Sequence, residues 1–229
     1  MKIERFTAAA AWVARGRALM EGALALSLRR GAGHARLCLA GGQTPEGLYR
    51  SLASLRFHGL QVDLYAGDER EVAADSPSRN GRMIREAFTG AAWAPPPRLV
   101  PWSEGSATEA ALQMDRRIRC AIGSGDAFFD LVVLGIGEDG HTAGLFPGDP
   151  AVSEKERFAI ASTAPVEPRS RMSFTIPALV STRAMFFFLR GPGKAAIVDA
   201  LEAGGSGLPA EALANAAQAV KPVILYCGS

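Results

Sequence analysis

The chain has 229 residues and 48% of them are hydrophobic, so it has enough apolar material for one core of ordinary domain size. Its 25 Lys and Arg residues and 23 Asp and Glu residues leave a net charge of +2, without the basic run or patch that a nucleic-acid surface needs. Three widely spaced cysteines favour a reducing compartment, and the sequence has neither a signal-peptide core nor the roughly 18 consecutive apolar residues of a membrane span. We therefore expect one cytoplasmic domain over residues 1–229 that binds neither nucleic acid nor a membrane.

The predicted elements alternate between helices and short apolar strands. The first helix ends at Arg30 and Gly31, and a second begins near Pro45. Between them ARLCLAGG is a strand, and the later strands are QVDLYAGDER, FFDLVVLGIGEDGH, AMFFFLRGPGK and PVILYC. Further helices are predicted for SATEAALQMDRRIRCAI, which opens with a capping-box spacing, for PGKAAIVDALEAGG, which ends on Gly204, and for PAEALANAAQAV, while the triple proline at 95–97 is expected in a connecting loop. The alternation predicts an α/β fold with a largely parallel central sheet flanked by helices.

Polar loops follow four of these strands. They are GGQTP at 41–45, GDER at 67–70, GIGEDGH at 135–141 and GPGK at 191–194. Because ligands bind at the carboxyl ends of the strands in open α/β sheets, we expect these loops to share one site.

The GGQTP loop is suited to a phosphate. Gly41 and Gly42 let the backbone approach a ligand, and the following helix offers free amides and the positive end of its dipole. The loop matches neither the Walker pattern nor the dinucleotide-binding pattern, and a tight turn without a ligand is the alternative. Lys194 and Arg171 could add positive charge, although each taken alone fits a solvated surface cation better.

His141 is the candidate general base. It follows Asp139 directly after a buried strand, where a carboxylate can orient the imidazole, whereas His34 and His58 fit surface roles. A structural loop histidine is the alternative. No second His or Cys stands at metal-ligand spacing to His141, and no GxSxG elbow is present, so we expect neither a metal site nor a serine triad.

The sequence GIGEDGHTAGLFPG at 135–148 resembles the GxGxDGHTAxLFPG pattern of the 6-phosphogluconolactonase family, within a wider group that includes glucosamine-6-phosphate deaminase. Three other elements of the family occur in the expected order: GGQTP at 41–45, DEREV at 68–72 and RMSFT at 171–175. The resemblance spans about residues 39–194. It implies a Rossmann-like fold of the NagB, RpiA and CoA-transferase type, and hydrolysis of 6-phosphoglucono-δ-lactone in the oxidative pentose phosphate pathway without metal or cofactor.

The resemblance also implies a role for each site residue. His141 would be the general base, Asp139 would orient it, and Arg70 would stabilise the oxyanion. The sugar would lie along Asp68 and Asn80. The phosphate would bind the backbone and side chains at the start of the second helix and two cations, that is, Gly41, Gly42, Gln43, Thr44, Arg171 and Lys194.

Some positions depart from the family pattern. Ala40 and Gln43 replace two serines, which predicts an amide contact to phosphate in place of a hydroxyl, and Arg79 places an extra cation near the substrate or on the surface. Gly144 replaces another serine, and the ending KPVILYCGS is atypical.

Two alternative functions stay open. The deaminases have an acid in the corresponding loop where this sequence has Phe146, and a phenyl ring cannot transfer a proton. A sugar-phosphate sensor without catalysis could keep the phosphate residues, yet it would not need Asp139 and His141. In each case the partner is a small phosphosugar, bound by a monomer or a small homo-oligomer.

Overall fold

The computed structural model describes residues 1–122 and 127–229, and its centre is a seven-stranded sheet. All neighbouring strands of this sheet are parallel. They run in the order β1 (Lys2–Phe6), β12 (Val223–Cys227), β11 (Met185–Arg190), β8 (Leu131–Leu134), β2 (His34–Leu39), β4 (Gln61–Ala66) and β7 (Arg98–Leu99). The predicted α/β fold with a parallel central sheet is therefore confirmed.

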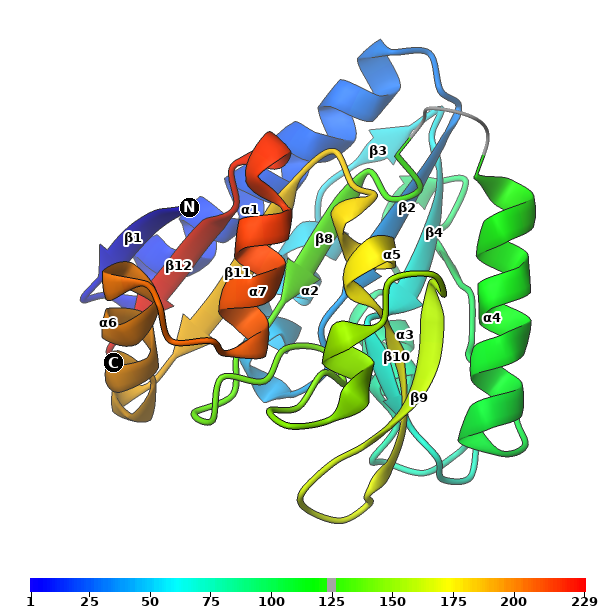
Figure 1. Cartoon of the computed structure of the whole chain (residues 1–229). Coiled ribbons are helices and arrows are strands. Elements are labelled where there is room, and N and C mark those ends of the chain that lie inside the picture. The colour runs from blue at the N-terminus through cyan, green and yellow to red at the C-terminus, as the bar shows by residue number, and fades with distance from the viewer. Residues whose placement is uncertain (123–126) are drawn as a thin grey trace.

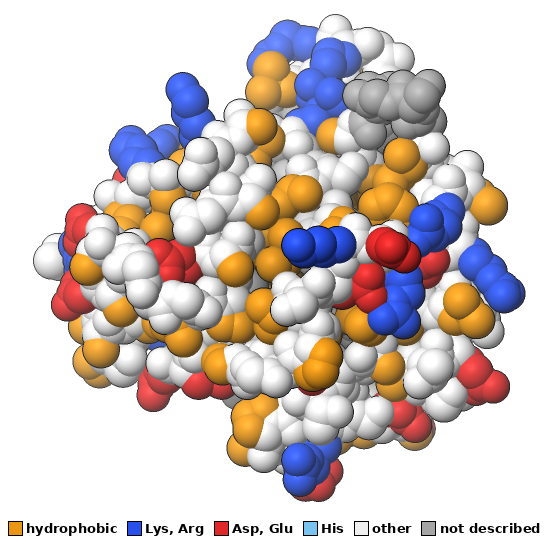
Figure 2. Space-filling view, viewed as in Figure 1, with side chains coloured by type: hydrophobic (Ala, Val, Ile, Leu, Met, Phe, Trp, Pro, Cys, Tyr) orange, Lys and Arg blue, Asp and Glu red, His pale blue; other side chains and the backbone are white. Residues whose placement is uncertain are grey.

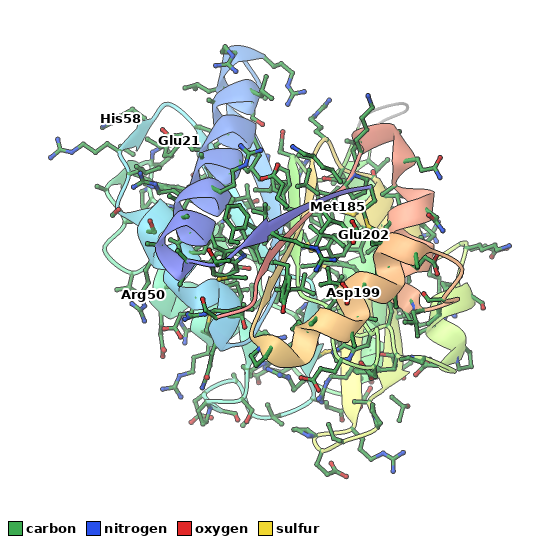
Figure 3. All side chains as sticks on the ribbon, turned by 90° about the vertical axis from the view of Figure 1, so that its left-hand side faces the viewer. Glu21, Arg50, His58, Met185, Asp199 and Glu202 are labelled. Carbon is green, nitrogen blue, oxygen red and sulfur yellow. The ribbon has the colours of Figure 1, made fainter. Side chains whose placement is uncertain are left out.

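Helices cover both faces of the sheet (Figure 1). Figure 3 looks toward the edge strand β1 and shows α1 (Ala9–Arg29) and α2 (Gln43–Ala53) on one side, with α6 (Ala195–Ala203) and α7 (Pro209–Ala216) on the other. The other helices are α3 (Asn80–Ala87), α4 (Ala107–Ala121) and α5 (Ile176–Val180), and single 3₁₀ turns form η1 (Pro150–Ser153), η2 (Pro192–Lys194) and η3 (Gln218–Val220). Among the described residues, no helix is both long and apolar enough to cross a membrane.

The central strands are buried on both faces, as parallel strands between helices are. β11 is an example, because Met185 through Leu189 are all buried. Trp12 of α1 packs edge-on against Phe188 at 5.5 Å between ring centroids, and its indole N–H donates to the Leu225 carbonyl at 3.0 Å. This packing fixes α1 over β11 and β12, so the ends of these strands are held on a rigid support.

Most predicted element ends are confirmed. The glycines after α1 and α6, Gly31 and Gly204, have φ angles of 69° and 73°, the left-handed region that favours glycine at a helix end. In α4 the Ser106 hydroxyl and the Glu109 side chain form both halves of the predicted capping box. The prolines at 95–97 lie between β6 (Trp93–Ala94) and β7, as expected for a connecting loop.

The structure differs from the prediction in the GDER segment. Asp68–Arg70 is not a loop at the end of β4 but a strand of its own, β5. It pairs antiparallel with β10 (Ser170–Phe174), which pairs with β9 (Ala159–Thr163). A further small sheet joins β3 (Phe57–His58) to β6. The antiparallel sheet was not predicted, and it lies beside the carboxyl ends of the central strands.

Basic side chains gather at the opposite end of the central strands. Arg30, Arg36 and Arg183 lie around a surface cavity near the start of β2, and Lys and Arg side chains cluster at the top of Figure 2, where α1 ends. The polar loops predicted to form the site are at the other end of the sheet.

Candidate active site

The carboxyl ends of β2, β8 and β11 border a cavity of about 330 Å³. The cavity brings together most of the predicted site residues: Gly41, Gly42, Thr44, Asp68, Arg70, Asn80, His141, Arg171 and Lys194. Two predicted residues, Asp139 and Gln43, are not among the described residues that line it. The expectation that the four polar segments meet at one rim is met, because each contributes to this wall.

His141 and Asp139 form a hydrogen-bonded pair in the loop after β8. The Asp139 Oδ1 atom lies 2.5 Å from His141 Nδ1 and accepts the His141 backbone N–H at 3.1 Å. Burial opposes the ionisation of Asp139, but the hydrogen bonds from the His141 amide and ring outweigh it and lower the carboxyl pKa. An ionised acceptor at Nδ1 favours the tautomer with its proton there, which leaves Nε2 as the proton acceptor.

The backbone of the 135–148 loop makes room for this pair. A Cβ atom on Gly137 would lie 2.1 Å from His141 Nδ1 and 2.3 Å from Asp139 Oδ1. The loop is closed by hydrogen bonds from the Gly137 amide to the His141 carbonyl at 2.8 Å and from the Gly140 amide to the Gly137 carbonyl at 3.0 Å. Because a Cβ at position 137 would overlap both side chains, this position must be glycine for the pair to form. Ala143 in the same loop has a φ of 48°, a conformation that residues other than glycine rarely adopt and that is often found at functional sites.

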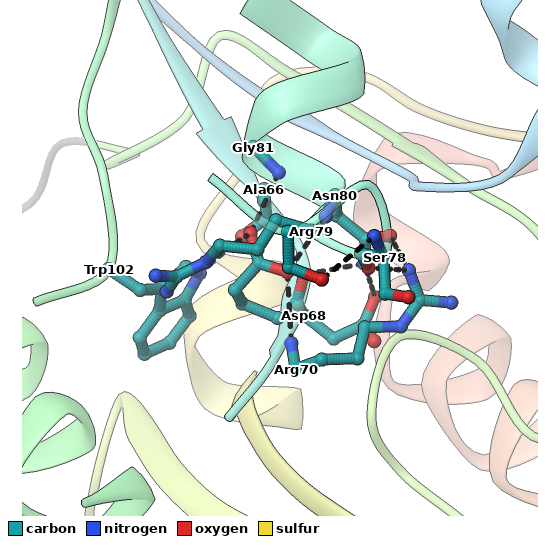
Figure 4. Close-up of polar contacts among 10 residues, drawn as sticks. Ala66, Asp68, Arg70, Ser78, Arg79, Asn80, Gly81 and Trp102 are labelled. Atoms are coloured by element: carbon teal, nitrogen blue, oxygen red, sulfur yellow. Dashed lines mark hydrogen bonds and ion pairs between the residues drawn. The ribbon is translucent and has the colours of Figure 1, made fainter. Parts of the chain in front are cut away.

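Asp68, Arg70 and Asn80 are joined in a second cluster (Figure 4). The Asn80 amide group donates to Asp68 Oδ1 at 3.0 Å and to the Asp68 carbonyl at 2.8 Å, while its oxygen accepts a hydrogen bond from Arg70. Arg70 also donates to the Ser78 carbonyl at 2.8 Å. A Cβ atom on Gly41 would overlap the Asn80 side chain, so the GGQTP loop touches this cluster directly.

Glu69 fixes the position of this cluster. Its buried carboxylate accepts the backbone N–H groups of Arg70 at 2.9 Å, of Asn80 at 2.7 Å and of Gly81 at 2.7 Å. Burial raises the pKa of Glu69, and these amides act against that rise. Arg79, expected near the substrate or on the surface, is instead buried, with its Nε atom 3.7 Å from the Glu69 carboxylate. Glu69 thus satisfies two of the free amides at the start of α3, those of Asn80 and Gly81.

Arg70 and Arg171 lie directly opposite each other on β5 and β10. Two like charges in this arrangement repel each other. Burial and the neighbouring Arg70 lower the pKa of Arg171, which is 6% exposed. Burial raises the pKa of Asp68, against the attraction of Arg70, Arg171 and His141. An anion bound between the two guanidinium groups would relieve their repulsion.

The start of α2 offers a second place for an anion. Gly42 has a φ of 89° and no side chain caps this helix end, so the first amides of α2 remain available. On the other side of the cavity, the Lys194 ammonium donates to the Ile136 carbonyl at 2.8 Å. Gln43 lines a neighbouring cavity with Glu46 and Asn80, and its contact to phosphate stays a prediction.

Two residues of the wall were not among the predicted site residues, although Phe146 was noted in the comparison with the deaminases. The Phe146 ring packs against His141 with ring centroids 4.8 Å apart and an angle of 38° between the ring planes. Arg190, the last residue of β11, also lines the cavity. Its place at the carboxyl end of a predicted strand was the signal that could have identified it.

No cluster of three or more His, Cys, Asp or Glu side chains that could hold a metal ion is found in the described ranges 1–122 and 127–229. The polar side chains that line the cavity carry one imidazole, one carboxylate, one amide, one hydroxyl and several cations. This set can exchange a proton with a bound molecule and hold negative charge.

Known proteins resemble this chain in sequence and in fold. The model of the family described as glucosamine-6-phosphate isomerases/6-phosphogluconolactonase matches residues 8–221. A 6-phosphogluconolactonase of Synechocystis is 33% identical over 168 residues, 71% of this chain and 69% of that protein. One of Mycobacterium tuberculosis is 32% identical over 179 residues, 73% of this chain and 72% of that protein.

Solved structures of 6-phosphogluconolactonases have a similar fold. The 6-phosphogluconolactonase of Thermotoga maritima superposes with a TM-score of 0.78 at 25% identity, covering 100% of this chain and 99% of that one. The 6-phosphogluconolactonase of Shewanella baltica has a TM-score of 0.84 at 22% identity, covers 100% of this chain and 98% of that chain, and supports the fold alone. Since the family model spans nearly the whole sequence, the chain belongs to the family of glucosamine-6-phosphate isomerases and 6-phosphogluconolactonases.

Proposed function

We propose that this protein hydrolyses 6-phospho-D-glucono-1,5-lactone to 6-phospho-D-gluconate, the second step of the oxidative pentose phosphate pathway. The observation that carries the proposal is the Asp139–His141 pair beside a cavity rich in cations, with a phenyl ring at position 146. Such a site can activate water and hold a phosphorylated substrate. The relatives named above as 6-phosphogluconolactonases support the same activity.

The reaction needs one base and one place for negative charge. His141 Nε2 takes a proton from water as the water oxygen bonds to the lactone carbonyl carbon, and the carbonyl oxygen becomes an oxyanion. Arg70 is the cation that we assign to this oxyanion. When the tetrahedral intermediate collapses, the bond from the carbonyl carbon to the ring oxygen breaks, and His141 returns its proton to that oxygen. The product carboxyl group then ionises and releases one proton to solvent.

The remaining site residues orient the base or bind the substrate. Asp139 holds the imidazole through Nδ1, and Asp68 and Asn80 lie along the sugar. The phosphate is assigned to the first residues of α2 together with Arg171 and Lys194. Since Arg171 lies opposite Arg70, the phosphate group and the oxyanion that forms at the lactone carbonyl are bound by neighbouring cations.

The alternatives from the same fold are less well supported. In the deaminase reading a carboxylic acid at position 146 would transfer protons during ring opening, and Phe146 is a buried hydrocarbon. In the sensor reading the Asp139–His141 pair would have no use. We therefore place both below lactone hydrolysis.

The test is acid release in weakly buffered solution, with the lactone generated in place from glucose 6-phosphate. The wild type should accelerate acid release well above the spontaneous rate, and His141→Ala should lose about 10²- to 10⁴-fold in kcat, the usual contribution of a general base. A wild type that adds nothing to the background would refute the proposal, and ammonia release from glucosamine 6-phosphate would then test the deaminase. A His141→Ala variant with full cellular function would favour the sensor.

We further propose that one domain over residues 1–229 acts in the cytoplasm as a monomer or a small homo-oligomer, without a nucleic-acid partner. The near balance of charges supports the last point. Light scattering after size-exclusion chromatography measures the oligomeric state, and retention on a heparin column at low salt would argue against the absence of a nucleic-acid partner.

A further inference from the structure

Arg190 is a cation of the cavity wall to which no role has been assigned. It is the last residue of β11, and the chain turns immediately after it at Gly191, whose φ is 101° and whose amide donates to the Cys227 carbonyl at 2.9 Å. Lys194 follows one turn later, at the end of η2. Two cations of the cavity therefore come from one short segment.

The guanidinium of Arg190 is held from one side. Its Nε atom donates to the main-chain oxygen of Ser229 at 2.8 Å. Ser229 is itself fixed, because its hydroxyl donates to the Thr7 carbonyl at 3.2 Å and the Gly228 amide donates to the Phe6 carbonyl at 3.3 Å. Among the residues that the structure describes, the two terminal nitrogens of Arg190 have no partner. They remain available as a pair of donors.

The surroundings of Arg190 favour an anion. α2 packs against β11, and its uncapped first turn lines the same cavity through Gly42 and Thr44. Gln43, which replaces a hydroxyl that the sequence resemblance assigns to phosphate, lines a different cavity. Lys194 gives one of its donors to the Ile136 carbonyl. A phosphate at the start of α2 would thus gain from a second cation on the β11 side.

We propose that Arg190 binds the phosphate group of the substrate, together with Lys194, and sets the preference for phosphorylated over unphosphorylated lactones. The inference rests on the proposed lactone hydrolysis. An arginine suits the role because its planar terminal N–H groups can donate in parallel to two phosphate oxygens. The segment 227–229 then has a function as well, since it anchors the Ser229 oxygen that orients this guanidinium.

The experiment compares Arg190→Ala and Arg190→Lys with the wild type on two substrates, 6-phosphoglucono-δ-lactone and glucono-δ-lactone, which lacks the phosphate. Arg50→Ala is the matched control, because Arg50 is an exposed arginine of α2 that pairs with Glu46 and does not line the cavity (Figure 3). For Arg190→Ala we expect kcat/KM on the phosphorylated lactone to fall about 10-fold or more through KM, the range of one charge-assisted hydrogen bond. Its value on glucono-δ-lactone should not change, and Arg190→Lys should recover part of the loss.

Binding of inorganic phosphate and of 6-phosphogluconate, followed by titration calorimetry, tests the inference without any turnover. Arg190→Ala should weaken both, whereas Arg50→Ala should weaken neither. Equal losses on both lactones, or unchanged binding of both anions, would overturn the role of Arg190. A wild type that binds the anions but hydrolyses no lactone would overturn the proposed function and leave the role of Arg190 in phosphate binding to be decided by this titration.

Discussion

Gly137→Ala tests whether the pairing of Asp139 with His141 is what activates water. The added Cβ would lie 2.1 Å from His141 Nδ1 and 2.3 Å from Asp139 Oδ1, whereas an ordinary contact begins at 3.4 Å. One or both side chains would have to move by more than 1 Å. The Nδ1 to Oδ1 distance is 2.5 Å, so a displacement of that size breaks the hydrogen bond.

The expected cost falls on catalysis and not on folding. A misplacement of about 1 Å in a catalytic group can lower the rate by about 10²-fold, and we expect kcat to fall by that amount. The Asp139 and His141 side chains are 42% and 36% exposed and can turn toward solvent. The free energy of unfolding should therefore change by about 1 kcal/mol or less.

The assay is acid release at saturating lactone, corrected for spontaneous hydrolysis, with thermal unfolding measured on the same samples. Gly47→Ala is the control, because a Cβ at that position meets no atom within 4 Å and Gly47 does not line the cavity. The double variant Gly137→Ala/His141→Ala should be no slower than His141→Ala alone, since both changes disable one unit. A Gly137→Ala variant with wild-type kcat would refute the assignment of this pair as the catalytic base.

Three further substitutions test contacts around the site and in the sheet. Glu69→Gln turns an NH₂ group toward a backbone amide, so the free energy of unfolding in urea should fall by about 1–3 kcal/mol; an unchanged midpoint would contradict the helix-capping role. Asp63→Asn removes the negative charge and replaces one of the two carboxylate oxygens that accept Arg98 N–H groups at 2.9 Å with an NH₂ group, and it should cost about 1.5–3 kcal/mol at neutral pH. Burial opposes ionisation of Asp63, but Arg98 and His34 outweigh it and lower the carboxyl pKa, so this stabilisation is present above the ordinary value of about 3.9 and is lost as pH falls through the folded-state value. A difference between wild type and Asp63→Asn that stayed constant in acid would count against it. Ser162→Ala removes a buried hydroxyl that has no partner among the described residues and should raise stability by about 1 kcal/mol; a loss of stability would show that the hydroxyl is paired.

The five inner strands of the central sheet could be predicted because they are continuous apolar runs, whereas the edge strands β1 (KIERF) and β7 (Arg98–Leu99) were not predicted. β11, for example, reads MFFFLR and is bounded by a glycine turn, so its position follows from local sequence. The capping box of α4 is equally local, since Ser106 and Glu109 are one turn apart. Because the carboxyl ends of parallel strands lie at one edge of a sheet, the polar loops were expected there, and each of them lines the same cavity. In each case the deciding residues are close together in the chain.

The antiparallel sheet could not be predicted in this way. β5 is three residues long and entirely polar, and its partner β10 is about a hundred residues away, so no local periodicity reveals the pairing. The same holds for α3, whose first amides are satisfied by Glu69 and not by a neighbouring side chain. The placement of Gln43 outside the cavity depends on how α2 is rotated against β11, which the motif does not specify.

These long-range contacts also explain how the site holds groups that are unfavourable in isolation. Arg70 and Arg171 face each other, burial raises the pKa of Asp68, and Ala143 has a positive φ. Local arrangements of this kind lower stability and persist where the surrounding structure fixes them. Here the Glu69 carboxylate, the β5–β10 pairing and the tight loop after β8 supply that support. A phosphorylated lactone would pair with the two arginines, so the same charges that oppose folding of the free protein favour binding of an anionic substrate.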